Sequence, residues 1–256
     1  MGFLQVQKEN KIATIQLNRP PANALSTQLI RELSAVFEEL ENDSETKVIL
    51  IKGEGRFFSA GADIKEFTTI ENEADFADLG AFGQQLFDRM ENYPKLIIAA
   101  IHGAALGGGL ELAMACHIRL VSSEAKLGLP ELQLGLIPGF AGTQRLPRYV
   151  GTAKAAEMLV TSDPITGEEA VKWGLATAAY PDAELFEKAY NLASKAAAKS
   201  SLSIRYTLEL LQYAARGQYS EGAKKESEYF GKVFVSEDGQ EGVQAFVEKR
   251  QPNFKN

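Results

Sequence analysis

The chain has 256 residues, of which 45% are hydrophobic and 24% charged, and its formal net charge is −7. This composition is that of a folded globular protein, and the length allows one large domain with an appended part. The acidic balance, with no run of Lys or Arg longer than two, disfavours nucleic-acid binding. The single cysteine, Cys116, excludes an intramolecular disulfide and fits a reducing compartment.

The sequence also lacks the usual signals for export or membrane insertion. The first residues, MGFLQVQKEN, do not contain a basic region followed by an apolar core. The longest apolar stretch, residues 96–116, is interrupted by His102 and Glu111 and is too short to span a bilayer. We therefore expect a cytoplasmic protein with no membrane partner.

The first 51 residues show a strand, helix, strand order. Residues 11–17 are expected to form a strand that ends in a turn at Pro20. Apolar residues then recur at three- and four-residue spacing over residues 29–40, behind the candidate N-cap Ser26, which predicts an amphipathic helix. The run VILI at residues 48–51 is typical of a buried strand. This order predicts an α/β fold with partly parallel pairing.

Glycine-bearing loops alternate with apolar elements in the middle of the chain. In chain order we expect a glycine-rich loop at 53–67, a helix at 76–90, a strand at 96–101, a helix starting near Glu111, a strand at 117–121, a second loop at 137–146 and a helix from about Thr152.

The last third of the chain is dominated by helical periodicity. Thr166 and Glu169 fit a capping box, and Gly174 is expected to close that short helix. Long helical patterns follow from Asp182, with breaks near Ser200, Gly217 and Ser236. We predict a core of residues 1–199 and a helical C-terminal region of residues 200–256.

The candidate chemistry lies in residues 96–136, where a strand runs through a glycine turn into a helix. Such a turn directs free backbone N–H groups, at the positive end of the helix dipole, toward a bound anion. Two converging N–H groups could stabilise a carbonyl oxygen that becomes negative in a transition state, and the loops containing Gly61–Ala62 and Gly108–Gly109 could each supply one. The glycine spacing fits neither a phosphate loop nor a dinucleotide motif. Only two histidines are present, and no metal-ligand spacing surrounds Cys116, which argues against a zinc site.

Spacing alone leaves other interpretations open. The glycines could equally serve turns and tight helix packing. Glu111 and Glu131 each lie at an expected helix start, Glu131 directly after Pro130, where a carboxylate stabilises the helix through its dipole without any catalytic role.

Four motifs resemble the crotonase, or enoyl-CoA hydratase/isomerase, superfamily. In chain order they are GEGRFFSAGADIKEF, IIAAIHGAALGGGLELAMACHIRL, KLGLPELQLGLIPGFAGTQRLPRYVG and EGVQAFVEKRQPNF. The similarity runs from residue 15 to residue 254. It implies a spiral of ββα units with two sheets, followed by a helical C-terminal region that mediates trimerisation, in a homohexamer built as a dimer of trimers.

The resemblance also implies the site. The oxyanion donors would be the N–H groups of Ala62 and Gly108, and the catalytic pair would be Glu111, as the base that activates water, and Glu131, as the acid that protonates C2. Gly139 would orient that water. An acyl-CoA thioester would be the substrate, with no separate cofactor and no metal, and the residues expected to contact its CoA part are Ala60, Ala62, Asp63, Ile64, Phe246 and Lys249.

The family pattern favours one reaction and leaves two alternatives. Two glutamates at this spacing favour hydration of trans-2-enoyl-CoA to 3-hydroxyacyl-CoA in fatty-acid or related acyl-CoA breakdown. A Δ3,Δ2-enoyl-CoA isomerase needs only one base, and some members of the superfamily bind RNA without catalysis. One departure from the common P-G-x-G-G-T pattern is that this chain has Phe140 and Ala141, and Phe140 could narrow the acyl end of the site.

Overall fold

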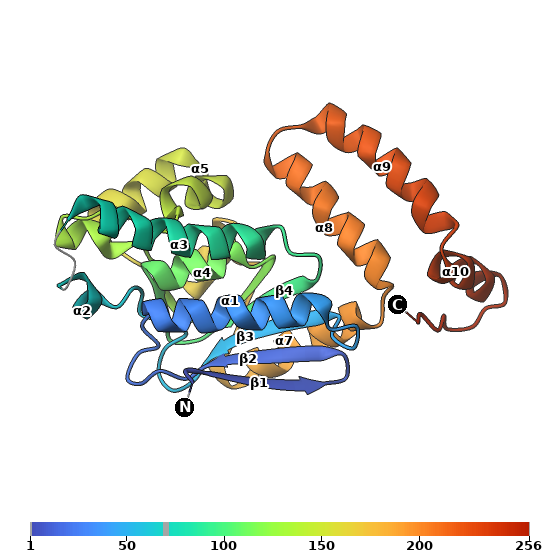
Figure 1. The fold of residues 1–256 in the computed structure, drawn as a ribbon, viewed down its shortest axis with the longest axis horizontal. Helices are drawn as coiled ribbons and strands as arrows, with labels where there is room; N and C mark the ends of the chain where they lie inside the picture. Colours follow the sequence, from blue (N-terminus) through green and yellow to red (C-terminus); the bar gives the residue numbers. More distant parts are fainter. Residues whose placement is uncertain (1, 69–71, 256) are drawn as a thin grey trace.

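The computed structural model describes residues 2–68 and 72–255, and Figure 1 shows their arrangement. In these ranges the strands are β1 (Leu4–Glu9), β2 (Ile12–Leu17), β3 (Val48–Gly53), β4 (Leu96–Ile101), β5 (Ala104–Leu106), β6 (Ile118–Ser122), β7 (Lys126–Gly128), β8 (Ile165–Thr166) and β9 (Ala178–Tyr180). The helices are α1 (Thr27–Asn42), α2 (Ile64–Phe67), α3 (Glu73–Glu91), α4 (Gly108–Ala115), the 3₁₀ turn η1 (Pro130–Leu134), α5 (Gly142–Thr161), α6 (Gly167–Lys172), α7 (Asp182–Ala197), α8 (Ser201–Ala215), α9 (Tyr219–Phe234) and α10 (Glu237–Val247).

The strands form two sheets that the chain visits in turn. A six-stranded sheet has the order β1-β2-β3-β4-β6-β9, in which only the β1–β2 pair is antiparallel. A three-stranded sheet has the order β5-β7-β8. The units β4-β5-α4 and β6-β7-η1 each place one strand in the large sheet, one in the small sheet, and then a helical turn. This repeat confirms the predicted spiral of ββα units.

The large sheet is covered on both faces, so its central strands are apolar throughout. Successive side chains point to opposite faces, and along β3 Ile49 and Ile51 join the main core while Val48 and Leu50 join a second cluster. The main core packs against α1, α3, α4 and α5, and the second cluster packs against α7. Parallel pairing of β2, β3 and β4 thereby brings the ends of these strands and the loops that follow them to one edge.

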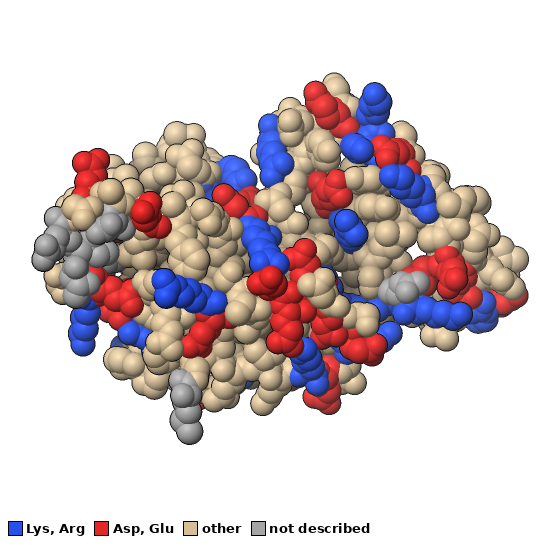
Figure 2. All heavy atoms as spheres, in the orientation of Figure 1, with Lys and Arg blue, Asp and Glu red and all other residues tan. Residues whose placement is uncertain are grey.

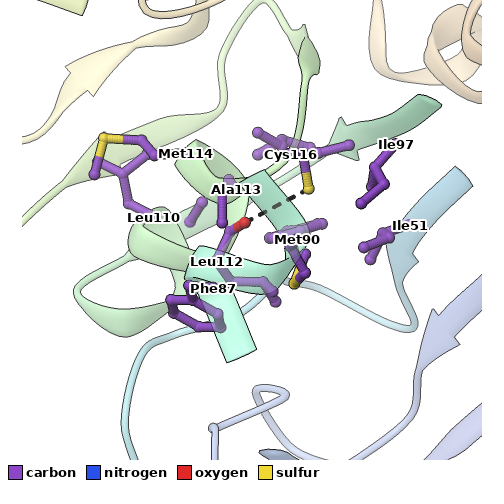
Figure 3. Packing of buried hydrophobic residues seen from close by; sticks show 14 of the residues in the cluster. Ile51, Phe87, Met90, Ile97, Leu110, Leu112, Ala113, Met114 and Cys116 are labelled. Carbon is purple, nitrogen blue, oxygen red and sulfur yellow. Dashed lines mark hydrogen bonds between the residues drawn. The ribbon is translucent and has the colours of Figure 1, made fainter. Parts of the chain in front are cut away.

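Helix α4 is the most enclosed helix in the main core. All eight of its residues are buried, and Glu111 is the single charged residue in this otherwise apolar helix. Figure 3 shows its side chains together with those of α3 and of the large sheet in one cluster, with these residues labelled: Leu110, Leu112, Ala113, Met114, Phe87, Met90, Ile51 and Ile97. The surrounding core therefore fixes the position of its N-terminus.

Most predicted elements are confirmed, and one helical segment was not predicted. Ser26 caps α1 and accepts a hydrogen bond from the N–H of Leu29 at 3.2 Å, and the Thr166–Glu169 capping box is formed. Gly151, at φ 75°, divides α5 into two helices, and the second begins at Thr152, as predicted. The first helix starts at Gly142 in a segment that was expected to be a loop, because Pro147 lies inside it.

The C-terminal helices stand to one side of the spiral. Figure 1 shows α8 and α9 running side by side beyond the end of the sheet, with α10 farther out, and the rings of Tyr206 and Tyr229 stack between α8 and α9 at 4.0 Å. The breaks predicted near Ser200, Gly217 and Ser236 are confirmed. The division at residue 200 into separate domains stays a prediction.

Charged side chains are interspersed on the face that Figure 2 shows, with no extended region of positive charge. In residues 2–68 and 72–255 no helix is both long enough and apolar enough to cross a membrane.

Candidate active site

A cavity of about 470 Å³ lies where the two glycine loops meet α3 and η1. Its walls come from residues 60–64, from α3, from the N-terminus of α4, and from η1 with the loop after it. The predicted site residues on these walls are Ala60, Ala62, Ile64, Gly108, Glu111, Glu131 and Gly139. The fold thus gathers residues that are up to 79 positions apart in the sequence.

The two predicted oxyanion donors lie next to each other. A Cβ placed on Gly108 would lie 3.3 Å from the N atom of Ala62, and a Cβ on Gly61 would lie 3.5 Å from the N atom of Gly108. Any side chain at Gly61 would also lie 2.9 Å from the carbonyl oxygen of Leu106. Because Gly61 has φ 104°, this close approach of the two loops requires glycine.

Neither donor group has a protein acceptor among residues 2–68 and 72–255. Leu25 pairs with Ala62 in a parallel bridge that uses the carbonyl of Gly61 and the N–H of Asp63, so the N–H of Ala62 points away from Leu25. Gly108 is the first residue of α4, where backbone N–H groups have no intrahelical acceptor. Within the described part of the chain neither N–H donates a hydrogen bond to a protein atom. Two convergent free N–H groups, one at a helix N-terminus, form an anion-binding arrangement.

Glu111 lies in the first turn of α4, and its side chain is 1% exposed. Its Oε1 accepts hydrogen bonds from the N–H groups of Phe140 at 2.9 Å and Gly142 at 2.7 Å. Burial, together with the charge of Glu131, raises the pKa of Glu111 to about 7, and these two hydrogen bonds oppose the rise because they favour the charged form. A carboxyl with this pKa can take up or release a proton near neutral pH.

Glu131 faces the same cavity from η1. Its Oε2 is buried and has no hydrogen-bond partner in the described part of the chain. Its Oε1 would lie 2.8 Å from a Cβ on Gly107, so the glycine directly before α4 leaves the room that this carboxyl occupies. Burial raises the pKa of Glu131 as well. The two carboxyls therefore have elevated pKa values in one cavity, which is typical of an acid–base pair.

The loop between η1 and α5 closes one side of the cavity. Gly139 lines the cavity, and its carbonyl accepts a hydrogen bond from the side chain of Gln84 at 2.8 Å. The ring of Phe140 packs edge-on against Phe87 and would contact a Cβ on Gly83 at 2.4 Å. Because the ring also lies 3.0 Å from the Cβ position of Gly108, it forms a wall beside the oxyanion donors.

Three residues predicted to contact CoA do not line this cavity. The carboxylate of Asp63 accepts a hydrogen bond from the N–H of Lys65, which caps α2, and forms an ion pair with Arg19. Phe246 is 85% exposed on α10 and Lys249 follows that helix, at the opposite end of the molecule from α2 and α5 (Figure 1). A contact of Phe246 or Lys249 with CoA stays a prediction.

Sequence reasoning missed the groups that hold Glu111. The N–H groups of Phe140 and Gly142 belong to a segment interpreted as a loop. Nearly every residue has a backbone N–H group, so the residue types in a sequence do not show which of these groups act as donors. In the described ranges, no three His, Cys, Asp or Glu side chains come together as a metal site.

Comparisons with known proteins agree with this geometry. Residues 7–256 match the family model described as "Enoyl-CoA hydratase/isomerase". The chain is 54% identical over 256 residues to a "Probable enoyl-CoA hydratase" of Bacillus subtilis (strain 168), covering 100% of this chain and 99% of that one. It is 39% identical to a "Short-chain-enoyl-CoA hydratase" of Clostridium acetobutylicum, covering 98% and 97%. A solved enoyl-CoA hydratase from Bacillus anthracis superposes with a TM-score of 0.94 at 36% identity, covering 99% of both chains.

The fold and the cavity define an enzyme of the crotonase class, in which backbone N–H groups and carboxyls share one site. The family model and these relatives make the assignment specific: the chain belongs to the enoyl-CoA hydratase/isomerase family.

Proposed function

We propose that this protein is an enoyl-CoA hydratase, which adds water across the 2,3 double bond of a trans-2-enoyl-CoA to give a 3-hydroxyacyl-CoA. The observation that carries the proposal is that the buried carboxyl of Glu111 and the half-buried carboxyl of Glu131 face one cavity with the N–H groups of Ala62 and Gly108. The relatives named as hydratases over the full chain length support the same reaction.

The reaction divides among these groups as follows. The thioester oxygen accepts hydrogen bonds from the N–H groups of Ala62 and Gly108, which stabilise the enolate formed when water attacks C3. Glu111, as the carboxylate, accepts a proton from that water, and Glu131, as the acid, donates a proton to C2. The product gains OH at C3 and H at C2, and the proton held by Glu111 then returns to Glu131 to restore the starting state.

The surroundings of the two carboxyls support opposite protonation states. Glu111 accepts two backbone N–H bonds, and these stabilise the carboxylate. The buried Oε2 of Glu131 has no partner in the described part of the chain, so a proton there could be donated to substrate. Because like charges in one cavity repel, ionisation of Glu111 also favours the protonated form of Glu131.

The test is hydration of crotonyl-CoA, followed as loss of the conjugated-thioester absorbance. We expect the wild type to hydrate the substrate, and Glu111→Gln and Glu131→Gln each to lower kcat at least about a hundredfold, the usual contribution of one acid or base. An enzyme that kept its activity without Glu111, or that moved a 3-enoyl double bond faster than it added water, would be an isomerase, which needs only one base.

Several finer features belong to the same proposal. We expect short enoyl-CoA thioesters from fatty-acid or related acyl-CoA breakdown as substrates, CoA to enter only as part of the substrate, and neither a separate cofactor nor a metal to be needed. A homohexamer and a cytoplasmic location stay predictions, and sedimentation of the purified protein tests the first of them.

A further inference from the structure

The peptide unit of Phe140 is held at both ends by charged side chains. Its N–H donates to Oε1 of Glu111 at 2.9 Å, and its carbonyl oxygen accepts a hydrogen bond from the Nη1 of Arg145 at 2.7 Å. Glu111 comes from α4 and Arg145 from α5, so the loop between η1 and α5 is fixed between the two helices. A movement of this peptide would change the hydrogen bonds of the Glu111 carboxylate.

Arg145 is itself fixed, because its side chain is 2% exposed and every part of the guanidinium has a partner. Nε donates to Oε2 of Glu91 at 3.1 Å and Nη2 to Oδ1 of Asp88 at 2.5 Å, both on α3. The other oxygen of Glu91 pairs with Arg148 at 2.6 Å. Arg145 does not line the catalytic cavity. The planar guanidinium can hold these three acceptors at once, which the single ammonium of a lysine cannot do in the same geometry.

We propose that Arg145 is a positioning residue, which holds the Phe140 peptide and through it the Glu111 carboxylate in the orientation that accepts a proton from water. The inference rests on the proposed function, since it gives the base of that reaction a support on α5.

Ala141 lies between Phe140 and Gly142, the two residues whose N–H groups donate to Glu111, and its backbone conformation needs to be held in place. Ala141 has φ 68°, in the left-handed region, where a residue with a Cβ is disfavoured by about 1–2 kcal/mol. The loop thus contains a conformation that its own sequence does not favour. Three hydrogen bonds hold this conformation in place. One runs from Arg145 to the carbonyl of Phe140, and two run from the N–H groups of Phe140 and Gly142 to Glu111.

The charges around Glu111 determine the direction in which its pKa should change when Arg145 is removed. Glu131 on η1 raises the pKa of Glu111 and Arg145 on α5 lowers it, while Asp88 and Glu91 on α3 face the guanidinium of Arg145. Removal of Arg145 takes away a nearby positive charge and loosens the peptide that donates to the carboxylate. Both changes disfavour the charged form, so the pKa of Glu111 rises and the base is lost at a higher pH.

The experiment compares Arg145→Met and Arg145→Lys with Arg148→Met as the matched control. Arg148 pairs with the same Glu91, whereas the hydrogen bond to the carbonyl of Phe140 comes from Arg145. We expect the acidic limb of the pH profile of kcat/KM for crotonyl-CoA to move to higher pH by about one unit in Arg145→Met. Relative to the wild type, kcat/KM should then be reduced by a factor about tenfold greater at pH 6 than at pH 9. Arg145→Lys should show a smaller shift, and Arg148→Met should keep the wild-type profile.

Two results would overturn the proposal. One is an equal reduction of kcat/KM at pH 6 and pH 9, which a merely structural role produces. The other is a wild-type pH profile of kcat/KM in both Arg145 variants. If Arg145→Met does not fold, Arg145→Lys, which keeps the buried charge, decides between these outcomes. Carbon-13 NMR titration of the Glu111 carboxyl in the wild type and in Arg145→Lys measures the same shift without substrate. Failure of the wild type to hydrate crotonyl-CoA would refute the proposed function, and the titration would still test Arg145.

Discussion

Replacing Gly142 with alanine would crowd the base of the reaction without straining the backbone. A Cβ at this position would lie 2.8 Å from Oε1 of Glu111 and 3.0 Å from Cδ1 of Leu129. Ordinary contacts of a Cβ begin at 3.4 Å, so the carboxylate oxygen would have to move by about 0.6 Å. Gly142 is the first residue of α5 and has no positive φ, and alanine favours helices. The substitution therefore acts on the position of Glu111.

A shift of this size should lower activity far more than stability. Misplacing a reacting group by 1 Å can reduce the rate about a hundredfold, so we expect Gly142→Ala to lower kcat for crotonyl-CoA hydration by about ten- to a hundredfold. Overpacking in a core has a typical cost of about 1–3 kcal/mol, so the variant should remain folded.

Thermal unfolding and kcat measured on the same preparation check this prediction. Gly231→Ala is the control, because Gly231 lies in α9 and its Cβ would meet nothing within 4 Å. Full activity of a folded Gly142→Ala protein would refute the argument that the exact place of the Glu111 carboxylate matters.

Three further predictions follow from the same loop and its partners. Because Glu111 acts as the ionised base and its pKa is raised to about 7, kcat/KM should fall as the pH drops through that value, and a flat profile from pH 5 to 8 would contradict the assignment. Phe140→Ala removes the ring that forms a wall of the site, so the kcat/KM ratio of six-carbon to four-carbon enoyl-CoA should rise; an unchanged ratio would show that Phe140 does not limit chain length. Ala141→Gly relieves the left-handed strain and should raise the free energy of unfolding by up to about 1 kcal/mol in a denaturant titration, whereas a decrease would mean that the entropy of glycine outweighs the strain.

Periodicity in the sequence predicted the long elements well and the short ones poorly. Helix α1 has a clear apolar stripe and an N-cap side chain, and both are visible in the sequence. The strands of the small sheet have only two or three residues each, which is too short for alternation to show. The start of α5 was missed because proline and glycine lie inside it. These short elements form because the larger ββα unit places them, which a local pattern cannot reveal.

The site was predictable in its residue types but not in how they are held. Two glycine loops suggested free N–H donors, while Glu111 and Glu131 could have been ordinary helix-start carboxylates until the resemblance to a family set them in one site. The pairing of the Phe140 peptide with Glu111 and Arg145 joins residues 29 and 5 positions apart through backbone atoms. Neither backbone polarity nor the place of a loop in space is encoded in a motif, so this support appears only in the folded chain.

The complete burial of α4 limits how the activity can be altered by mutation. Because no residue of this helix faces solvent, each side chain that fixes the core also fixes Gly108 and Glu111. A change such as Leu112→Ala would open a cavity in the core and also shift Gly108 and Glu111 from their positions. A substitution in α4 therefore changes stability and rate at the same time. New substrate ranges are therefore more accessible through residues 134–137, where Leu134 and Ile137 are exposed on the cavity wall and can change without disturbing the core.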